Sequence, residues 1–145
     1  MVFIIHDKNV VMLENPKAAS NTLITIMRHI AKHNKSQDVE HLKDDDQFMT
    51  AQEVYLHLLS NGHNPENYSI VMPTRNPYTK VFSQYHDHIQ SNNEQDSAEN
   101  FDNFVSNNAD LANSTLEKLG LDASGEALFT HVVRCETMRS DLEDV

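Results

Sequence analysis

The sequence is short of residues that cross-link a chain or interrupt its regular structure. Among 145 residues there are one cysteine, three glycines, four prolines and no tryptophan. The single Cys135 excludes an internal disulfide, whereas a short secreted chain normally needs several. We therefore expect a reducing compartment and a cytoplasmic location. With 39% hydrophobic residues, the composition indicates a folded globular chain rather than a fibrous or disordered one.

Positive charge is also scarce, because 11 Lys and Arg stand against 22 Asp and Glu, and the formal net charge is -11. An acidic surface repels polyanions, so nonspecific binding to nucleic acid or to an anionic membrane is excluded. An anionic ligand would have to be held locally by a few well-placed cations. Lys17 and Arg75 are placed in this way, each between a predicted strand and a predicted helix.

Long hydrophobic runs are absent. The apolar run at 2–5 is far shorter than the core of a signal peptide, and no basic stretch precedes it. No segment approaches the ~20 apolar residues that a membrane helix needs, so we expect a soluble chain with no membrane partner. A chain of this length suits one hydrophobic core, and we expect residues 1–145 to form a single small domain.

The regular elements follow from apolar spacing. Short β-branched or apolar runs predict strands at 2–5, 10–13, 68–72 and 131–134, the third stopping at Pro73. Helical spacing predicts helices at 23–31, 50–61, 77–89, 101–105 and 114–119, and the start of another after Thr137. The polar stretch 34–47 predicts an exposed loop. Strands that alternate with helices predict an α/β fold with a mainly parallel sheet flanked by helices.

Three of the predicted helices have recognisable start signals. Ser20 or Asn21 is a suitable N-cap for the first helix, and Thr50 with Glu53 forms a capping-box pattern at the second. Asn76-Pro77 combines a good N-cap with a proline at the first helical position. The first and third of these helices each follow directly from a predicted strand.

The first strand-to-helix loop is a candidate anion site. Free backbone N–H groups and the positive end of the helix dipole converge at such a loop. Lys17 adds a charge, Ala18 and Ala19 keep the loop slim, and the next three residues, Ser20 to Thr22, offer side-chain hydrogen bonds. The glycines and the Gly-Lys-Ser/Thr ending of nucleotide triphosphatases are missing. The alternative is a solvated lysine beside an ordinary capped helix.

The second strand-to-helix loop supplies a different cation. Arg75 follows a strand and precedes a helix, and Ser83 lies about two turns along that helix. A guanidinium is suited to a fixed, bidentate grip on a phosphate. The alternatives are a surface arginine paired with a carboxylate and a serine that only packs. Taken together, the two loops predict a ligand with anionic groups at both ends.

These segments resemble a known family. Residues 16–22 resemble the phosphosulfate loop of sulfotransferases, and residues 68–85, with Arg75-Asn76-Pro77 followed by Ser83 and Tyr85, resemble their 3′-phosphate segment. The second match is similar to the carbohydrate sulfotransferase branch. Weaker similarities lie at 101–105 and 134–142. The resemblance implies a P-loop-like α/β fold and 3′-phosphoadenosine 5′-phosphosulfate (PAPS) as donor, with no metal.

The resemblance also implies roles for single residues. Lys17 would contact the 5′-phosphosulfate and its bridging oxygen, with Ser20 and Asn21 on neighbouring oxygens. Arg75 and Ser83 would hold the 3′-phosphate. The remaining loop residues of the implied cofactor site are Pro16, Ala18, Ala19 and Thr22. The implied partner is a hydroxyl-bearing acceptor, either a carbohydrate or a small molecule.

Transfer to a hydroxyl usually needs a base, and several side chains qualify. We favour His41, which lies between the two cofactor segments, with Glu53 and His57 as alternatives. Nine histidines also raise the possibility of a metal site, since His29 and His33 share a helix face. Two ligands do not make a site, so solvated histidines are the better interpretation.

The chain is short for the family branch that it resembles, whose members generally continue well past residues 136–137. We therefore expect either a reduced domain or a fragment, with cofactor binding better supported than turnover. Three functions stay open: a PAPS-dependent sulfotransferase, a non-catalytic module that binds PAPS or its product, and another phosphate-ester or nucleotide enzyme.

Overall fold

A computed structural model describes residues 2–42, 49–108 and 115–144. Its centre is a five-stranded sheet in the order β3-β1-β2-β4-β5. The strands are β1 (Val2–Ile5), β2 (Val10–Met12), β3 (Val39–Leu42), β4 (Ser69–Thr74) and β5 (His131–Arg134). β1 runs antiparallel to both neighbours, while β2, β4 and β5 are parallel to one another. Four strands thus share one direction, and the predicted α/β fold is confirmed.

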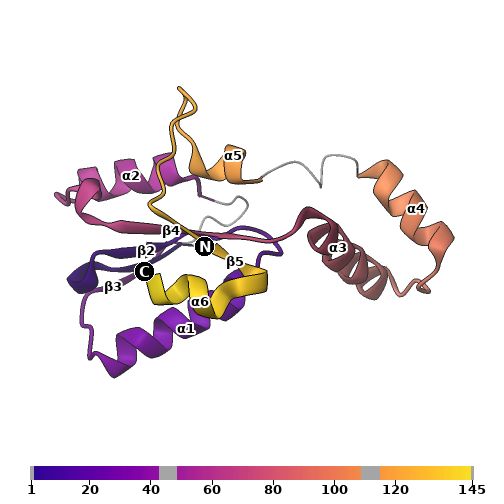
Figure 1. The fold of residues 1–145 in the computed structure, drawn as a ribbon, viewed down its shortest axis with the longest axis horizontal. Helices are drawn as coiled ribbons and strands as arrows, with labels where there is room; N and C mark the ends of the chain where they lie inside the picture. The colour runs from indigo at the N-terminus through magenta and orange to yellow at the C-terminus, as the bar shows by residue number, and fades with distance from the viewer. Residues whose placement is uncertain (1, 43–48, 109–114, 145) are drawn as a thin grey trace.

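Helices cover both faces of this sheet (Figure 1). α2 (Ala51–Ser60) and α5 (Thr115–Gly120) lie on one face, and α1 (Ser20–His33) and α6 (Met138–Asp141) on the other. α3 (Pro77–Asn92) and α4 (Ala98–Asn107) extend beyond the end of β4, to the right in Figure 1. Short 3₁₀ turns complete the described elements: η1 (His6–Lys8), η2 (Pro65–Asn67), η4 (Cys135–Thr137) and η5 (Leu142–Asp144).

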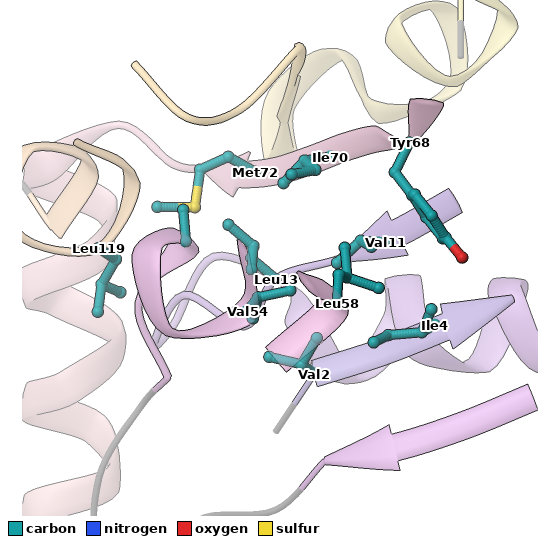
Figure 2. Packing of buried hydrophobic residues seen from close by; sticks show 11 residues of the cluster. Val2, Ile4, Val11, Leu13, Val54, Leu58, Tyr68, Ile70, Met72 and Leu119 are labelled. Carbon is teal, nitrogen blue, oxygen red and sulfur yellow. The ribbon is translucent and has the colours of Figure 1, made fainter. Parts of the chain in front are cut away.

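Two hydrophobic clusters hold these layers to the sheet. In the first, Val54 and Leu58 of α2 face the strands, and Tyr68 lies at the end of the cluster away from Leu119 (Figure 2). In the second, Leu23 and Met27 of α1 pack on the opposite face of the sheet. All four residues of β1 are buried, because both faces of this strand are covered. This explains why 2–5 is a continuous apolar run.

The predicted loop at 34–47 is wrong over 39–42, where the chain forms the edge strand β3; residues 43–48 lie outside the described part. β3 pairs only with β1, and Glu40 and His41 stand opposite Ile4 and Phe3. None of its residues is fully buried. An edge strand tolerates charged side chains, so its sequence lacks the apolar signal used for the other strands.

β4 does not stop at Pro73 but continues to Thr74. Along β4, the backbone groups of Ser69 and Val71 point toward β2, since Ser69 donates to Asn9 and Val71 accepts from Leu13. Pro73 is two residues further on and therefore faces the same side, where β2 has already ended. The missing N–H of Pro73 costs no ladder bond there, and its carbonyl accepts from the Asn15 side chain at 2.7 Å.

Among the described helices, α2, α3, α5 and α6 begin within one residue of the predicted start, and α4 begins three residues before it. Thr50 and Glu53 form the predicted capping box, with Thr50 N–H donating to Glu53 Oε2 at 2.6 Å. α4 is held against α3 by Tyr85, Ile89 and Phe104, which form a small separate cluster. In the part of the chain that the structure describes, no helix combines the length and apolarity needed to cross a bilayer.

Candidate functional site

The first predicted phosphate-binding segment lies between β2 and α1. Lys17 and Ala19 both have φ of 59°, in the left-handed region. Ser20 Oγ accepts from the Asn15 N–H at 3.0 Å and donates to the Asn15 carbonyl at 2.7 Å. Because Asn15 is also tied to Pro73, the loop is fixed to both β4 and the start of α1.

The N-cap of α1 differs from the prediction. The cap position is Ala19, not Ser20 or Asn21, and this residue makes no side-chain cap hydrogen bond. No acidic residue lies in that turn either. The first amides of a helix have no partner inside it, so this N-terminus can receive an anion. Ser20 is instead buried, with 6% of the residue exposed, and its hydroxyl bonds the loop backbone.

The second segment lies at the neighbouring strand end. Asn76 Oδ1 accepts from the Tyr78 N–H at 3.0 Å, which confirms Asn76-Pro77 as the start of α3. The Asn76 N–H donates to Glu136 Oε1 at 2.8 Å, so the turn after β5 also supports this position. That hydrogen bond lowers the pKa of Glu136, and the nearby Arg75 charge adds to the effect. The segments that follow the parallel strands β2, β4 and β5 thus meet at the same end of the sheet.

Arg75 joins the two segments. Its Nη1 donates to the Lys17 carbonyl at 3.2 Å, and its Nε donates to Thr79 Oγ1 at the same distance. A guanidinium presents several N–H groups in a rigid plane, so both bonds form without using every donor. The side chain is therefore held between the loop and the first turn of α3.

A pocket of about 350 Å³ opens where the segments meet. It is lined by Glu14, Asn15, Pro16, Lys17, Ala19, Ser20, Asn21, Arg75 and Ser83. Seven of the nine predicted cofactor residues are therefore brought together. Ala18 is buried and Thr22 is exposed, and neither lines the pocket.

Two lining residues, Glu14 and Asn15, were missed from the sequence. Both directly precede the predicted loop, and Asn15 is 2% exposed. A buried asparagine at the end of a strand usually bonds backbone groups. An asparagine directly after a predicted strand was therefore the signal that could have identified Asn15. Glu14 puts a carboxylate on the wall of a pocket that also carries Lys17 and Arg75.

None of the three predicted bases lines this pocket. His41 lies on β3, separated from β2 by β1, and its ring meets Phe3 edge-on at 4.3 Å between centroids. Glu53 is engaged in the capping box with Thr50. The identity of the base stays a prediction.

His57 belongs to a polar cluster at the opposite end of the sheet from the pocket, where the strands β2 and β4 begin. Its Nε2 lies 3.0 Å from both Glu40 oxygens, and His6 Nε2 lies 3.2 Å from Glu40 Oε2. His6 also bonds the Tyr68 hydroxyl at 2.8 Å and stacks on His63. Partial burial acts to raise the pKa of Glu40, but the bonds and charges of His57 and His6 outweigh it and lower this pKa.

In the described ranges, no group of three or more His, Cys, Asp or Glu side chains could hold a metal ion. The pocket itself offers groups of the kinds that bind anions. It combines an ammonium, a guanidinium, hydroxyls and the open N-terminus of α1.

A mainly parallel α/β sheet with such a pocket at adjacent strand ends is an arrangement suited to holding an anionic ligand. The model of the sulfotransferase family matches residues 1–138, so the chain belongs to the sulfotransferase family. Neither the curated proteins nor the solved structures contain a match to the chain. Family membership confirms the resemblance seen in the two loops and supports sulfuryl transfer as the class of reaction.

Proposed function

We propose that this protein transfers a sulfuryl group from PAPS to a hydroxyl on a carbohydrate or small molecule. The observation that carries the proposal is the single pocket that Lys17, Arg75 and Ser83 share. PAPS has anionic groups at both its 5′ and 3′ positions, and the pocket has one cation from each of two loops. Family membership supports the same donor.

The residues have distinct proposed roles. Lys17 and the open first turn of α1 would bind the 5′ end, where negative charge grows on the departing phosphate. Arg75 and Ser83 would bind the 3′-phosphate. Asn15 and Ser20 would keep the loop in shape, because both already bond backbone groups within or beside it. When bound, the donor supplies the activated sulfuryl group.

Calorimetric titration with adenosine 3′,5′-bisphosphate, the product left by PAPS, tests the proposal. We expect binding by the unchanged protein and weaker binding by Lys17→Ala. Arg75→Ala should remove the preference for the bisphosphate over adenosine 5′-phosphate. Arg28→Ala, an exposed arginine further along α1, is the matched control and should bind normally. A protein that does not bind the bisphosphate would overturn the proposal.

A non-catalytic binding module is the second candidate. It is favoured by the position of His41, Glu53 and His57 outside the pocket lining. Transfer of radiolabelled sulfate from PAPS to a panel of hydroxyl acceptors separates the two functions. If His41 is the base, His41→Ala should lose transfer while its affinity for the bisphosphate stays unchanged. Binding without transfer to any acceptor would support the module.

A further inference from the structure

Lys17 already has an acidic partner inside the structure. Its ammonium forms an ion pair with the carboxylate of Asp87, which lies on α3. The Lys17 side chain is 31% exposed and that of Asp87 is 56% exposed, so the pair lies at the surface rather than in the core. Lys17 lines the pocket. A loop residue at the end of β2 is thus connected to a helix that follows β4.

The position of Asp87 is set by the elements that build the pocket. Asp87 follows Ser83 by four residues, so the two side chains share one face of α3. Asp87 is also the only acidic residue between Pro77 and Asn92. On the other side, the Lys17 backbone is held in the left-handed region and its carbonyl bonds Arg75. Both partners are therefore on restrained backbone.

An anion that enters the pocket needs the same ammonium. A carboxylate and a phosphate cannot both hold it at full strength, and the like charges of Asp87 and the ligand also repel each other. Binding at the 5′ end therefore requires Lys17 to leave Asp87 at least in part. The cost is modest because an exposed pair contributes little to stability.

We propose that Asp87 is a positioning residue that holds the Lys17 amine in the free protein and releases it to the donor. The proposal rests on the function proposed above. The ion pair keeps the lysine side chain directed toward α3 until an anion binds in the pocket. It also lowers the affinity for the desulfated product, which must leave after each transfer.

The first test needs no ligand. Lysine amines are methylated with formaldehyde and a mild reductant, and the rate at Lys17 is read by peptide mass spectrometry, with Lys8 and Lys35 as internal references. An amine held by a carboxylate reacts more slowly than a free one. Asp87→Asn should raise the Lys17 rate about two- to fivefold, in line with an exposed ion pair, and Asp87→Glu should restore it. An unchanged rate in Asp87→Asn would overturn the proposal.

The second test measures the consequence for binding. Asp87→Asn should bind adenosine 3′,5′-bisphosphate about two- to fivefold more tightly than the unchanged protein, and Asp87→Glu should bind like the unchanged protein. In a Lys17→Met background, Asp87→Asn should have a much smaller effect, because there is then no ammonium for Asp87 and the ligand to compete for. Asp102→Asn on the exposed face of α4 removes the same charge and is the control.

The outcomes separate the inference from the function on which it rests. If the unchanged protein does not bind the bisphosphate, the proposed function fails and the role in donor binding fails with it. If it binds but Asp87→Asn gains the same affinity in both backgrounds, simple repulsion explains the effect and the positioning role is wrong. Faster methylation of Lys17 together with a gain that depends on Lys17 supports the proposal.

Discussion

The Arg75 guanidinium donates to the Lys17 carbonyl oxygen at 3.2 Å, and this bond connects the loops after two neighbouring parallel strands. Through it, the residue proposed for the 3′-phosphate supports the backbone of the residue proposed for the 5′ end. The two loops therefore act as one structural unit before any ligand binds. A change at Arg75 should affect both ends of the pocket.

Arg75→Lys keeps the charge but loses the planar guanidinium. A lysine cannot maintain the bonds to both Lys17 and Thr79 in one fixed geometry, so we expect the free energy of unfolding to fall by about 0.5–1 kcal/mol. Affinity for the bisphosphate should fall as well. Urea unfolding and calorimetry measure the two effects. Arg28→Lys is the control, and an Arg75→Lys protein as stable as the original would contradict the structural link.

Ser20→Ala tests the loop itself. Without the hydroxyl, the Asn15 N–H loses its 3.0 Å acceptor at a position that is 2% exposed. The Asn15 carbonyl still accepts from the Ala18 N–H at 3.1 Å. One unsatisfied buried donor costs about 1–3 kcal/mol, so we expect a loss of that size in urea unfolding.

The control for this change is Thr25→Ala, which removes an exposed hydroxyl that bonds the Asn21 carbonyl in the same helix. Alanine favours a helix, so the stability of this variant should stay the same or rise. Equal losses in Ser20→Ala and Thr25→Ala would show that the Ser20 hydroxyl has no special role in holding the loop.

Glu40→Gln tests the cluster at the opposite edge of the sheet. The pKa of Glu40 is lowered in the folded protein, so its contribution to stability is fully present above the unfolded pKa of about 4.3. The contribution is lost as the pH falls through the lower folded pKa. We expect the original protein to be more stable than Glu40→Gln near pH 5.5, by no more than about 1 kcal/mol because the carboxylate is partly solvated.

This difference should shrink steadily as the pH is lowered from 5.5 toward 3. Thermal unfolding over that range, with both proteins at each pH, measures it. Glu66→Gln removes an exposed glutamate close to Tyr68 in sequence and serves as the control. A difference that grows toward acid pH would contradict the arrangement of Glu40 with His57 and His6.

The sequence contained enough information for most elements because apolar spacing and caps are local signals. Asn76-Pro77 is an example, since its side chain caps the helix that directly follows. β3 was missed because an edge strand is stabilised by its partner, here β1, and not by an apolar pattern of its own. The continuation of β4 through Pro73 depends on where β2 ends, which is a property of the whole sheet.

The same distinction holds for the site. The types of residue in the two loops predicted an anion pocket, and the structure places Lys17, Arg75 and Ser83 on the lining of the same pocket. The sequence could not show that Lys17 meets Asp87, because the partners are 70 positions apart and one of many carboxylates had to be chosen. For a similar reason, the position of His41 in the sequence between the two loops could not show where its side chain lies relative to the pocket.

Asp141→Asn tests how the end of the described chain is fastened to the sheet. The Asp141 carboxylate accepts from the backbone N–H of Arg134 at 2.8 Å and from the Arg134 guanidinium. It also accepts from the Thr137 hydroxyl at 2.9 Å. The bonds from Arg134 hold the pKa of Asp141 far below its usual range. Asparagine can accept only at its single amide oxygen, so it cannot replace this set of hydrogen bonds.

We expect faster amide hydrogen exchange at 131–141 in Asp141→Asn at neutral pH, with little change in α2 on the other face of the sheet. Glu143→Gln, an exposed acid in the following turn, should leave that exchange unchanged. Equal exchange in Asp141→Asn and the original protein would mean that packing of Met138 and Leu142 against the α1 face, rather than this carboxylate, holds the segment in place.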